Sequence, residues 1–445
     1  MRVLVVGGGG REHALVHSFS RSSLRPHVFC APGNAGIAAE ADCVPVGADD
    51  LEGLLGFAAR ERPDLTVVGP EAPLVDGLAD LFREHGLLVF GPDARAAQME
   101  GSKVFAKEVM DEAGAPTGAY SRHTSAESAF AALAAQSSYP VVVKADGLAA
   151  GKGVIIAADE AEARAAVESM LVARSFGSAG DVVLVEEHLT GSEVSLLVLC
   201  DGETAVPLAP AQDYKRIFAG DLGPNTGGMG SYCPVPGFGQ RAVDAAMDTV
   251  VQPVLDALKR RGITYRGVLY AGLIVTADGL KVLEFNCRFG DPETQAVLPR
   301  LESDLLELCL AAASGELAGA APAWTAEDCV TVVMASAGYP ASSHKGDVLE
   351  GLEAAAALPG VTVYHAGTAA AGVTGGTPAP AVATAGGRVL AVSALGDGFA
   401  AARERAYEGI GAIRFDGAQT RPDIAERAVR AQAGEISLFP EGWRP

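Results

Sequence analysis

Basic residues are scarce in this sequence. Its 445 residues include 34 Lys and Arg against 55 Asp and Glu, which gives a formal net charge of −21. Nucleic-acid binding requires a basic footprint, so we expect no nucleic-acid partner. Phosphate-bearing small molecules stay open as ligands, because a few local cations and free backbone N–H groups are sufficient to bind them.

Apolar runs long enough to cross a membrane are also missing. The first residues, Met1–Val6, lead directly into a glycine turn and then Arg11, which is typical of a first strand and not of a signal peptide. The seven cysteines are odd in number and scattered without a Cys-x-x-Cys, which favours small buried thiols in a reducing compartment. We therefore expect a cytoplasmic protein with no membrane partner.

Several nucleotide-binding and catalytic signatures are absent. The run Gly7–Gly10 fails the dinucleotide fingerprint, because Glu12 or His13 stands where its third glycine belongs. The spacing from Gly147 to Gly151 is too short for a Walker loop. No Gly-x-Ser-x-Gly elbow occurs. We interpret the eight histidines as forming no metal-ligating pair or cluster, so we expect no zinc site.

What is present favours an α/β enzyme of two to four domains, with 49% hydrophobic and only 6% aromatic residues. Residues 1–101 alternate short apolar strands with helices, as in a doubly wound parallel sheet. Residues 121–190 form a small unit. Residues 102–120 and 191–320 form a larger mixed unit, and residues 325–425 a small α/β domain.

Three local predictions concern the connections between these strands. The apolar spacing predicts one helix over Leu74–His85. The glycine-rich stretches Asp213–Tyr232 and Thr368–Thr384 are interpreted as loops.

The segment Lys281–Gln295 carries the first strong chemical signal. It begins as a strand whose alternation places Val282, Glu284 and Asn286 on one face. One carboxylate and one amide oxygen form an incomplete set of hard ligands, which suits Mg²⁺ shared with substrate phosphates. Taken alone, the pair is more typical of an edge strand with solvated polar side chains.

The segment Val141–Val154 is the second strong signal. A strand ends in Lys144, a glycine loop carries Lys152, and another strand follows, so the unit can lie over a triphosphate as a flap. The alternative is an ordinary hairpin with two solvated lysines, but a lysine at the end of three valines is hard to explain in that way.

Weaker signals occur where other strands end. A phosphate monoester can sit on Gly8–Arg11, although tight strand–helix packing explains these glycines equally well. Glu71 can bind sugar hydroxyls or an amine. Alternatively, its carboxylate stabilises a helix N-terminus through the helix dipole. The segment Glu186–Leu189 can pair with an adenine edge and Glu193 with a ribose, or these can be solvated acids in a turn. The polar stretch 212–230 is either a mobile surface loop or the seat of a second substrate.

The order of these motifs resembles that of ATP-grasp carboxylate–amine ligases. Three stretches narrow the resemblance, namely residues 9–14 (GGREHA), 220–230 (GDLGPNTGGMG) and 284–295 (EFNCRFGDPETQ). Together they are similar to the phosphoribosylamine–glycine ligases, also called glycinamide ribonucleotide synthetases. His188 and Ser192 depart from this pattern, since an aromatic residue and Glu are usual there.

The resemblance implies a multi-domain ATP-grasp fold with an N-terminal substrate domain (1–101), an ATP-grasp core (102–120 and 191–320), a mobile lid (121–190) and a small C-terminal domain (325–425). It implies that ATP, glycine and 5-phosphoribosylamine give ADP, phosphate and glycinamide ribonucleotide through glycyl phosphate, the second step of de novo purine synthesis. We expect Mg²⁺ or Mn²⁺ on Glu284 and Asn286, and a monomer.

The same resemblance assigns ATP contacts to one set of residues: Lys103, Lys144, Gly147, Gly151, Lys152, Gly153, Glu186, Glu187, His188, Leu189 and Glu193. The substrates are expected on Gly8, Gly9, Gly10, Arg11, Glu12, Asn34, Glu71, Asp213, Asn225 and Arg288. The catalytic set is Lys144, Asp213, Lys215 and Arg288, in which Arg288 would hold the glycine carboxylate and Asp213 its ammonium.

Other functions stay open at this point. The nearest is an ATP-grasp ligase acting on another acid and amine. A biotin-dependent carboxylase would need no phosphosugar pocket at Gly7–Arg11, and a non-catalytic nucleotide sensor would not need Glu284 and Asn286 together with Lys144. The failed fingerprint disfavours a Rossmann oxidoreductase.

Overall fold

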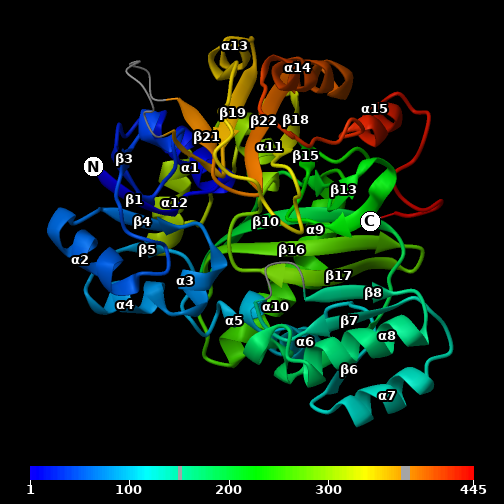
Figure 1. Ribbon diagram of the computed structural model, residues 1–445. Helices are drawn as coiled ribbons and strands as arrows, with labels where there is room; N and C mark the ends of the chain where they lie inside the picture. Colours follow the sequence, from blue (N-terminus) through cyan, green and yellow to red (C-terminus); the bar gives the residue numbers. More distant parts are fainter. Residues whose placement is uncertain (149–152, 372–380, 445) are drawn as a thin grey trace.

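The computed structural model describes residues 1–148, 153–371 and 381–444. The N-terminal part is a parallel sheet in the order β3-β2-β1-β4-β5, as predicted (Figure 1). The strands are β1 (Arg2–Gly7), β2 (His27–Pro32), β3 (Asp42–Cys43), β4 (Leu65–Val68) and β5 (Val89–Phe90), and the helices are α1 (Gly10–Ser20), α2 (Leu51–Glu61), α3 (Glu71–Val75) and α4 (Leu78–Glu84). Val3 to Val6 are fully buried, which explains the unbroken apolar run of β1.

The predicted helix over Leu74–His85 is wrong. The chain forms α3 and α4 instead, and Gly77 between them has φ +89°. This left-handed conformation ends one helix and starts the next at an angle, and only glycine adopts it without steric cost.

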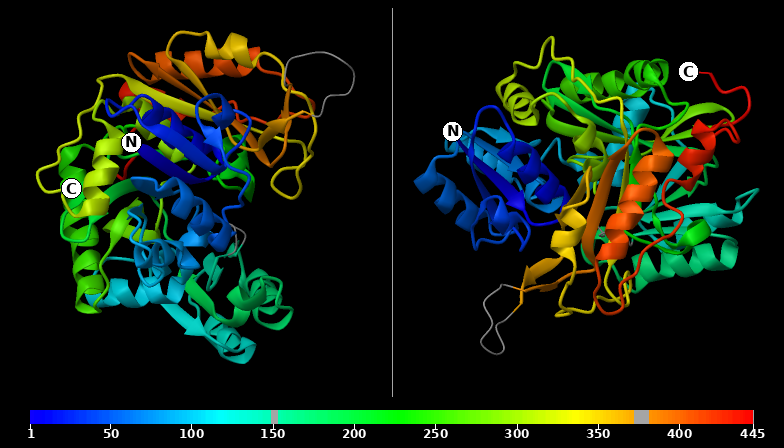
Figure 2. Two further views of the ribbon diagram at one scale, coloured as in Figure 1. Left: turned by 90° about the vertical axis from the view of Figure 1, so that its left-hand side faces the viewer. Right: turned by 90° about the horizontal axis from the view of Figure 1, so that it is seen from above.

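A second sheet, antiparallel in the order β6-β9-β7-β8, forms the unit we call the lid (Figure 2). Its strands are β6 (Tyr120–His123), β7 (Val141–Ala145), β8 (Val154–Ala157) and β9 (Val183–Glu187), packed under α7 (Ala126–Ala134) and α8 (Glu160–Val167). The apolar side chains between this sheet and its helices form a cluster separate from the two larger cores. The lid therefore has a core of its own, as an independently moving unit requires.

The central sheet is antiparallel in the order β11-β10-β16-β17. Its strands are β10 (Ser192–Asp201), β11 (Ala205–Pro207), β16 (Arg266–Thr276) and β17 (Gly279–Asn286). Two helical stretches lie near this sheet. One is α6 (Lys103–Ala113). The other is formed by α9 (Gln240–Ala246) and α10 (Gln252–Arg260), which are joined by the π-helical residues 247–251.

A β-bulge corrects the predicted alternation along β17. Gly272 pairs with Glu284 but Leu273 pairs with Val282, so Leu283 is the extra residue. The bulge resets the two-residue period, and Val282 joins the hydrophobic core while Glu284 and Asn286 share the other face. Glu284 and Asn286 therefore share one face of the strand, as predicted, but Val282 lies on the opposite face.

The C-terminal sheet has the order β12-β15-β18-β22-β19 and begins with two strands from the predicted loop 213–232. Its strands are β12 (Gln212–Asp213), β15 (Gly230–Cys233), β18 (Asp328–Ala335), β19 (Val361–His365) and β22 (Arg388–Gly396), with α14 (Phe399–Ala412) packed on it. The rest of that predicted loop forms the hairpin of β13 (Arg216–Phe218) and β14 (Leu222–Asn225). Strands β20 (Thr368–Ala370) and β21 (Val382–Thr384) occupy the ends of the other predicted loop.

The arrangement places the N-terminal sheet, the lid and the C-terminal sheet around the central sheet (Figures 1 and 2). Six cysteines are buried and Cys43 is exposed, and all seven are free thiols. No helix in the described ranges has the length and apolar character that a membrane span needs.

Replacing glycine with alanine should have opposite effects on the stability of the protein at Gly77 and at Gly56. Gly77→Ala forces a β-carbon into left-handed backbone and should destabilise the protein by about 1–2 kcal/mol. Gly56→Ala lies in the middle of α2, where the nearest atom is 3.9 Å from the new β-carbon, and should stabilise by about 0.5–1 kcal/mol. Urea unfolding of both variants measures the two signs, and a stabilising Gly77→Ala would contradict the backbone argument.

Candidate active site

A cavity of about 720 Å³ opens between the central sheet, the lid and the other two sheets. Seventeen of the predicted site residues line it: Arg11, Glu71, Lys103, Lys144, Gly147, Gly153, Glu186, Glu187, His188, Leu189, Glu193, Asp213, Lys215, Asn225, Glu284, Asn286 and Arg288. Gly151 and Lys152 lie outside the described residues. The fold therefore brings motifs that are 270 residues apart into one space.

Lysines from two parts of the fold converge on this cavity. Lys103 begins α6, where Ser102 caps the helix, and its Nζ donates to the carbonyl of Gly147 at 3.0 Å. Lys144 is the next-to-last residue of β7, and its Nζ donates to Glu186 Oε2 at 2.8 Å. The strand-end lysine is buried, not solvated, so it is not part of an ordinary surface hairpin.

Glu284 stands on β17 opposite Gly272, which leaves room for its side chain. Burial alone would raise the pKa of Glu284, but Lys215, Lys144 and Lys103 outweigh it and lower the pKa below its ordinary 4.5. The group is thus a carboxylate inside a cationic ring.

Glu284 and Asn286 offer two hard oxygens on one strand face. The amide oxygen of Asn286 accepts a long bond of 3.4 Å from Arg288 Nη2. Within the described residues, no group of three His, Cys, Asp or Glu side chains is placed to hold a metal by itself. The donor set therefore fits a divalent metal that takes its remaining ligands from phosphates and water, as Mg²⁺ does.

The histidine interpretation overlooked one spacing. His13 and His17 stand four residues apart on α1, and their rings approach Glu40 Oε1 at 3.4 Å and 3.0 Å. These three do not form a metal-holding group among the described residues.

Asp213 and Lys215 follow one another along the edge of the C-terminal sheet. Burial raises the pKa of Asp213 from 3.8 to about 8; Lys215 opposes the rise, and the nearby carboxylate of Glu293 adds to it. Lys215 Nζ lies 2.8 Å from Glu193 Oε2. This part of the cavity is rich in carboxylates around a single ammonium group.

Arg288 is held by two carboxylates. Its Nε lies 3.3 Å from Glu71 Oε2 and its Nη2 2.9 Å from Glu100 Oε1. Glu100 also accepts from the backbone N–H of Cys287 at 2.8 Å. A guanidinium anchored in this way presents a fixed face to a ligand.

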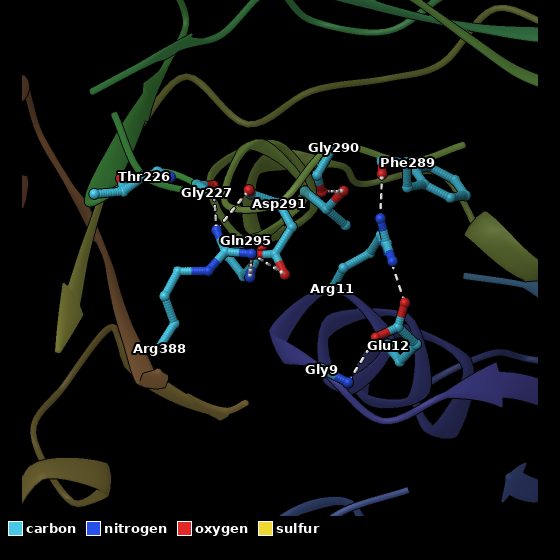
Figure 3. A network of polar contacts seen from close by, with 12 residues as sticks. Gly9, Arg11, Glu12, Thr226, Gly227, Phe289, Gly290, Asp291, Gln295 and Arg388 are labelled. Atoms are coloured by element: carbon cyan, nitrogen blue, oxygen red, sulfur yellow. Dashed lines mark hydrogen bonds and ion pairs between the residues drawn. The ribbon is translucent and has the colours of Figure 1, made fainter. Parts of the chain in front are cut away.

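Five predicted substrate residues do not line the cavity: Gly8, Gly9, Gly10, Glu12 and Asn34. Glu12, in the first turn of α1, accepts a hydrogen bond at Oε2 from the backbone N–H of the N-cap residue Gly9 at 2.6 Å (Figure 3). This bond is the side-chain half of a capping box. The Asn34 amide group donates to the carbonyls of Gly8 and His365 and accepts from two backbone N–H groups. A β-carbon on Gly8 would lie 2.5 Å from the carbonyl oxygen of Gly33, so close packing requires this glycine.

Other cavity residues were not predicted. Glu293 is 4% exposed, and its Oε1 accepts from Tyr270 at 2.9 Å and Ser195 at 3.3 Å. Glu293 belongs to the 284–295 motif and could have been chosen from it. Arg388 comes from β22, donates to the carbonyls of Gly227 and Asp291, and lies 3.1 Å from Asp291 Oδ2 (Figure 3). No local signal marked this arginine, because its partners are about 100 residues or more away.

Comparison with known proteins identifies the family. Residues 1–100, 101–294 and 329–427 match, in this order, the N domain, the ATP-grasp (A) domain and the C domain of phosphoribosylglycinamide synthetase. The chain belongs to the phosphoribosylglycinamide synthetase family. It is therefore a ligase with an ATP-grasp domain, which uses ATP together with a divalent metal.

Relatives of this family match the chain over nearly its whole length. Proteins named phosphoribosylamine–glycine ligase are 48% identical in Pseudomonas aeruginosa, over 98% of this chain and 100% of that protein, and 50% identical in Streptomyces coelicolor, over 97% and 100%. A crystal structure of the Thermotoga maritima phosphoribosylamine–glycine ligase is 31% identical, with a TM-score of 0.79 over 96% of this chain and 100% of that one. The biotin carboxylase domain of Hydrogenobacter thermophilus 2-oxoglutarate carboxylase has the same fold, with a TM-score of 0.71 at 17% identity over 97% and 98% of the two chains.

The raised pKa of Asp213 predicts a pH-dependent stability. Between its ordinary 3.8 and about 8, the folded state holds a proton that the unfolded state has released, so this group makes stability fall as the pH rises. Asp213→Asn removes that slope. The variant should gain on the parent by about 3 kcal/mol from pH 5 to pH 8 in urea unfolding.

Asp201→Asn is the control of opposite sign. Asp201 accepts from the N–H groups of Glu203, Thr204 and Leu317, and although burial would raise its pKa, these bonds lower it below 3.8. That variant should be less stable than the parent at neutral pH, and the difference should shrink as the pH falls below about 4. Parallel pH profiles for Asp213→Asn and the parent would contradict the assignment.

Proposed function

We propose that this chain joins the carboxylate of glycine to the amine of 5-phosphoribosylamine and converts ATP to ADP and phosphate. The product is glycinamide ribonucleotide, formed in the second step of de novo purine synthesis. The observation that carries this proposal is the match to proteins named phosphoribosylamine–glycine ligase over 96–98% of the chain at 46–50% identity. The cavity supports it, because it gathers groups of the kinds that an acyl-phosphate ligase needs.

ATP binds between the lid and the central sheet in this proposal. The phosphates lie along Lys103, Lys144 and the loop at Gly147, Gly151, Lys152 and Gly153. The base and ribose lie along Glu186, Glu187, His188, Leu189 and Glu193. The support is that each of the described members of this set lines the cavity.

The metal is proposed to be Mg²⁺, or Mn²⁺ in its place, on Glu284 and Asn286. When bound, it neutralises phosphate charge and polarises the γ-phosphoryl group. Glu284 is suited to hold it because the surrounding lysines keep its carboxylate ionised.

Glycine is proposed to lie between Arg288 and Asp213. Arg288 holds the glycine carboxylate. Asp213, with Lys215 beside it, receives the glycine ammonium, whose positive charge lowers the pKa of Asp213 so that its carboxyl group ionises on binding. A carboxylate oxygen then attacks the γ-phosphorus and ADP leaves, which forms glycyl phosphate. Lys144 and Lys215 offset the negative charge that gathers between the two anions.

Phosphoribosylamine is proposed to enter from the N-terminal sheet. Arg11, Glu71 and Asn225 line the cavity. In this proposal they contact the phosphosugar. Gly8, Gly9, Gly10, Glu12 and Asn34 shape the strand–helix turn that holds Arg11 in place. The amine nitrogen attacks the carbonyl carbon of glycyl phosphate, phosphate leaves with the electrons of the broken C–O bond, and the nitrogen releases a proton.

The domain division is part of the proposal. The N-terminal domain comprises residues 1–101, the core 102–120 and 191–320, the lid 121–190 and the C-terminal domain 325–425, in a monomer. Acyl phosphates hydrolyse readily, so the lid should close over the cavity during turnover. Its separate hydrophobic core supports movement as one body.

The proposed reaction makes ADP formation depend on two acceptors. ADP should form only when glycine and freshly prepared phosphoribosylamine are both present, because the acyl phosphate is protected until the amine arrives. A coupled assay for ADP measures this, with each substrate omitted in turn. Turnover without glycine would favour a ligase acting on another acid, and no turnover with any acceptor would favour a nucleotide sensor.

Glu284→Gln tests the metal site. It keeps the shape of the side chain but removes the charge, so ligase turnover should fall by about 100-fold or more. The variant should still fold, with some loss of stability because Lys215, Lys144 and Lys103 lose their carboxylate partner. Glu203→Gln, whose carboxylate forms an exposed pair with Lys259, should retain full turnover. Retained turnover of Glu284→Gln at saturating Mg²⁺ would refute the assignment.

A further inference from the structure

Lys107 is a buried lysine that none of the proposed steps uses. It lies one turn after Lys103 on α6, so both side chains face the cavity that they line. Lys107 is 2% exposed, donates to Thr117 Oγ1 at 2.8 Å, and lies 3.3 Å from Glu186 Oε2. A lysine buried to this degree requires a partner, and Glu186 is that partner.

The two oxygens of Glu186 have unequal surroundings. Lys144 and Lys107 share Oε2, at 2.8 Å and 3.3 Å. Oε1 is buried and has no hydrogen-bond partner among the described residues. A buried acceptor without a donor is costly, so the site has capacity for one N–H group at this oxygen.

Apolar side chains stand beside Glu186 on the same face of the lid sheet. Val142 of β7 pairs with Glu186 of β9, and Ile156 of β8 pairs with Val142. Directly paired residues of neighbouring strands point to the same side, and all three line the cavity. A flat apolar group with an N–H donor on its edge fits this surface. Adenine has that donor in its 6-amino group, whereas guanine presents a carbonyl oxygen at the same position.

We propose that Lys107 is a positioning residue for recognition of the nucleotide base. Together with Lys144 it holds Oε2 of Glu186, so that Oε1 accepts from the 6-amino group of adenine. Thr117 completes the arrangement, because its Oγ1 donates to the carbonyl of Val282 on β17 at 2.8 Å. The lysine thus links the lid strand that carries Glu186 to the central sheet through Thr117. This inference rests on the proposed ATP site.

Lys107→Met tests the inference by direct binding of two probes, ADP and its 6-desamino analogue, purine riboside diphosphate. The full-length parent should bind ADP about 10- to 100-fold more tightly, since the contact joins an amino group to a carboxylate. In Lys107→Met this ratio should fall to about threefold or less. The affinity for the analogue should change little, because it never used Oε1.

Two further variants keep the test decisive. Thr117→Val retains the lysine but removes its anchor, and should reduce the ratio in part even if Lys107→Met does not fold. Lys107→Arg should preserve most of the ratio, since the positive charge on Glu186 is kept. Lys259→Met, which removes the exposed pair with Glu203, is the matched control and should leave the ratio unchanged.

Two outcomes would contradict a role of Lys107 in recognition of the base. If Lys107→Met weakens ADP and the analogue by the same factor, or changes only the melting temperature, Lys107 is a structural residue and the inference is overturned. An unchanged ratio in folded Thr117→Val and Lys107→Met overturns it as well. Neither probe requires glycine or phosphoribosylamine, so failure of the proposed reaction would appear separately, in the ADP-formation assay of the parent.

Discussion

Charge compensation inside one cavity is the constraint on which this structure depends. Glu284 is ionised because Lys215, Lys144 and Lys103 surround it, and Arg288 can lie partly buried because Glu71 and Glu100 flank it. An isolated charge in such surroundings would be strongly unfavourable, so each of these groups requires the others. The site behaves as one electrostatic unit, in which no member is dispensable without cost to its partners.

This unit also explains why the protein has several sheets around one cavity. Lys144 and Glu186 come from the lid, Glu284 from the central sheet, Lys215 from the edge of the C-terminal sheet, and Arg11 from the N-terminal domain. No single sheet could present cations and carboxylates from so many directions. The bond from Lys144 Nζ to the carbonyl of Leu283, at 3.4 Å, and the bond from Lys103 to Gly147 join the lid to the core across the cavity. Movement of the lid therefore changes the cationic lining where the phosphates are proposed to bind.

Most strands and helices could be predicted from the chain because their signals are local. The helix Lys103–Ala113 and the hairpin around Asp278 and Gly279 follow from capping residues, periodicity and turn residues, and both were confirmed. The errors arose where distant contacts override local preference. The bulge at Leu283 depends on the pairing of β17 with β16. Strand β15 forms against β18, and β12 forms in turn against β15.

The sequence by itself determined the family, the order of the motifs and the chemical types at the proposed site, including Lys144, Glu284 and Asn286. These depend on residue identity and on spacing within a single strand or turn, which a linear sequence contains. Only the tertiary structure decided which groups meet. It turned Asn34 into the support of a turn, brought Arg388 to Asp291, and placed Lys107 against Glu186. Such pairings join residues tens to hundreds of positions apart, and they follow from how sheets pack, not from any local pattern.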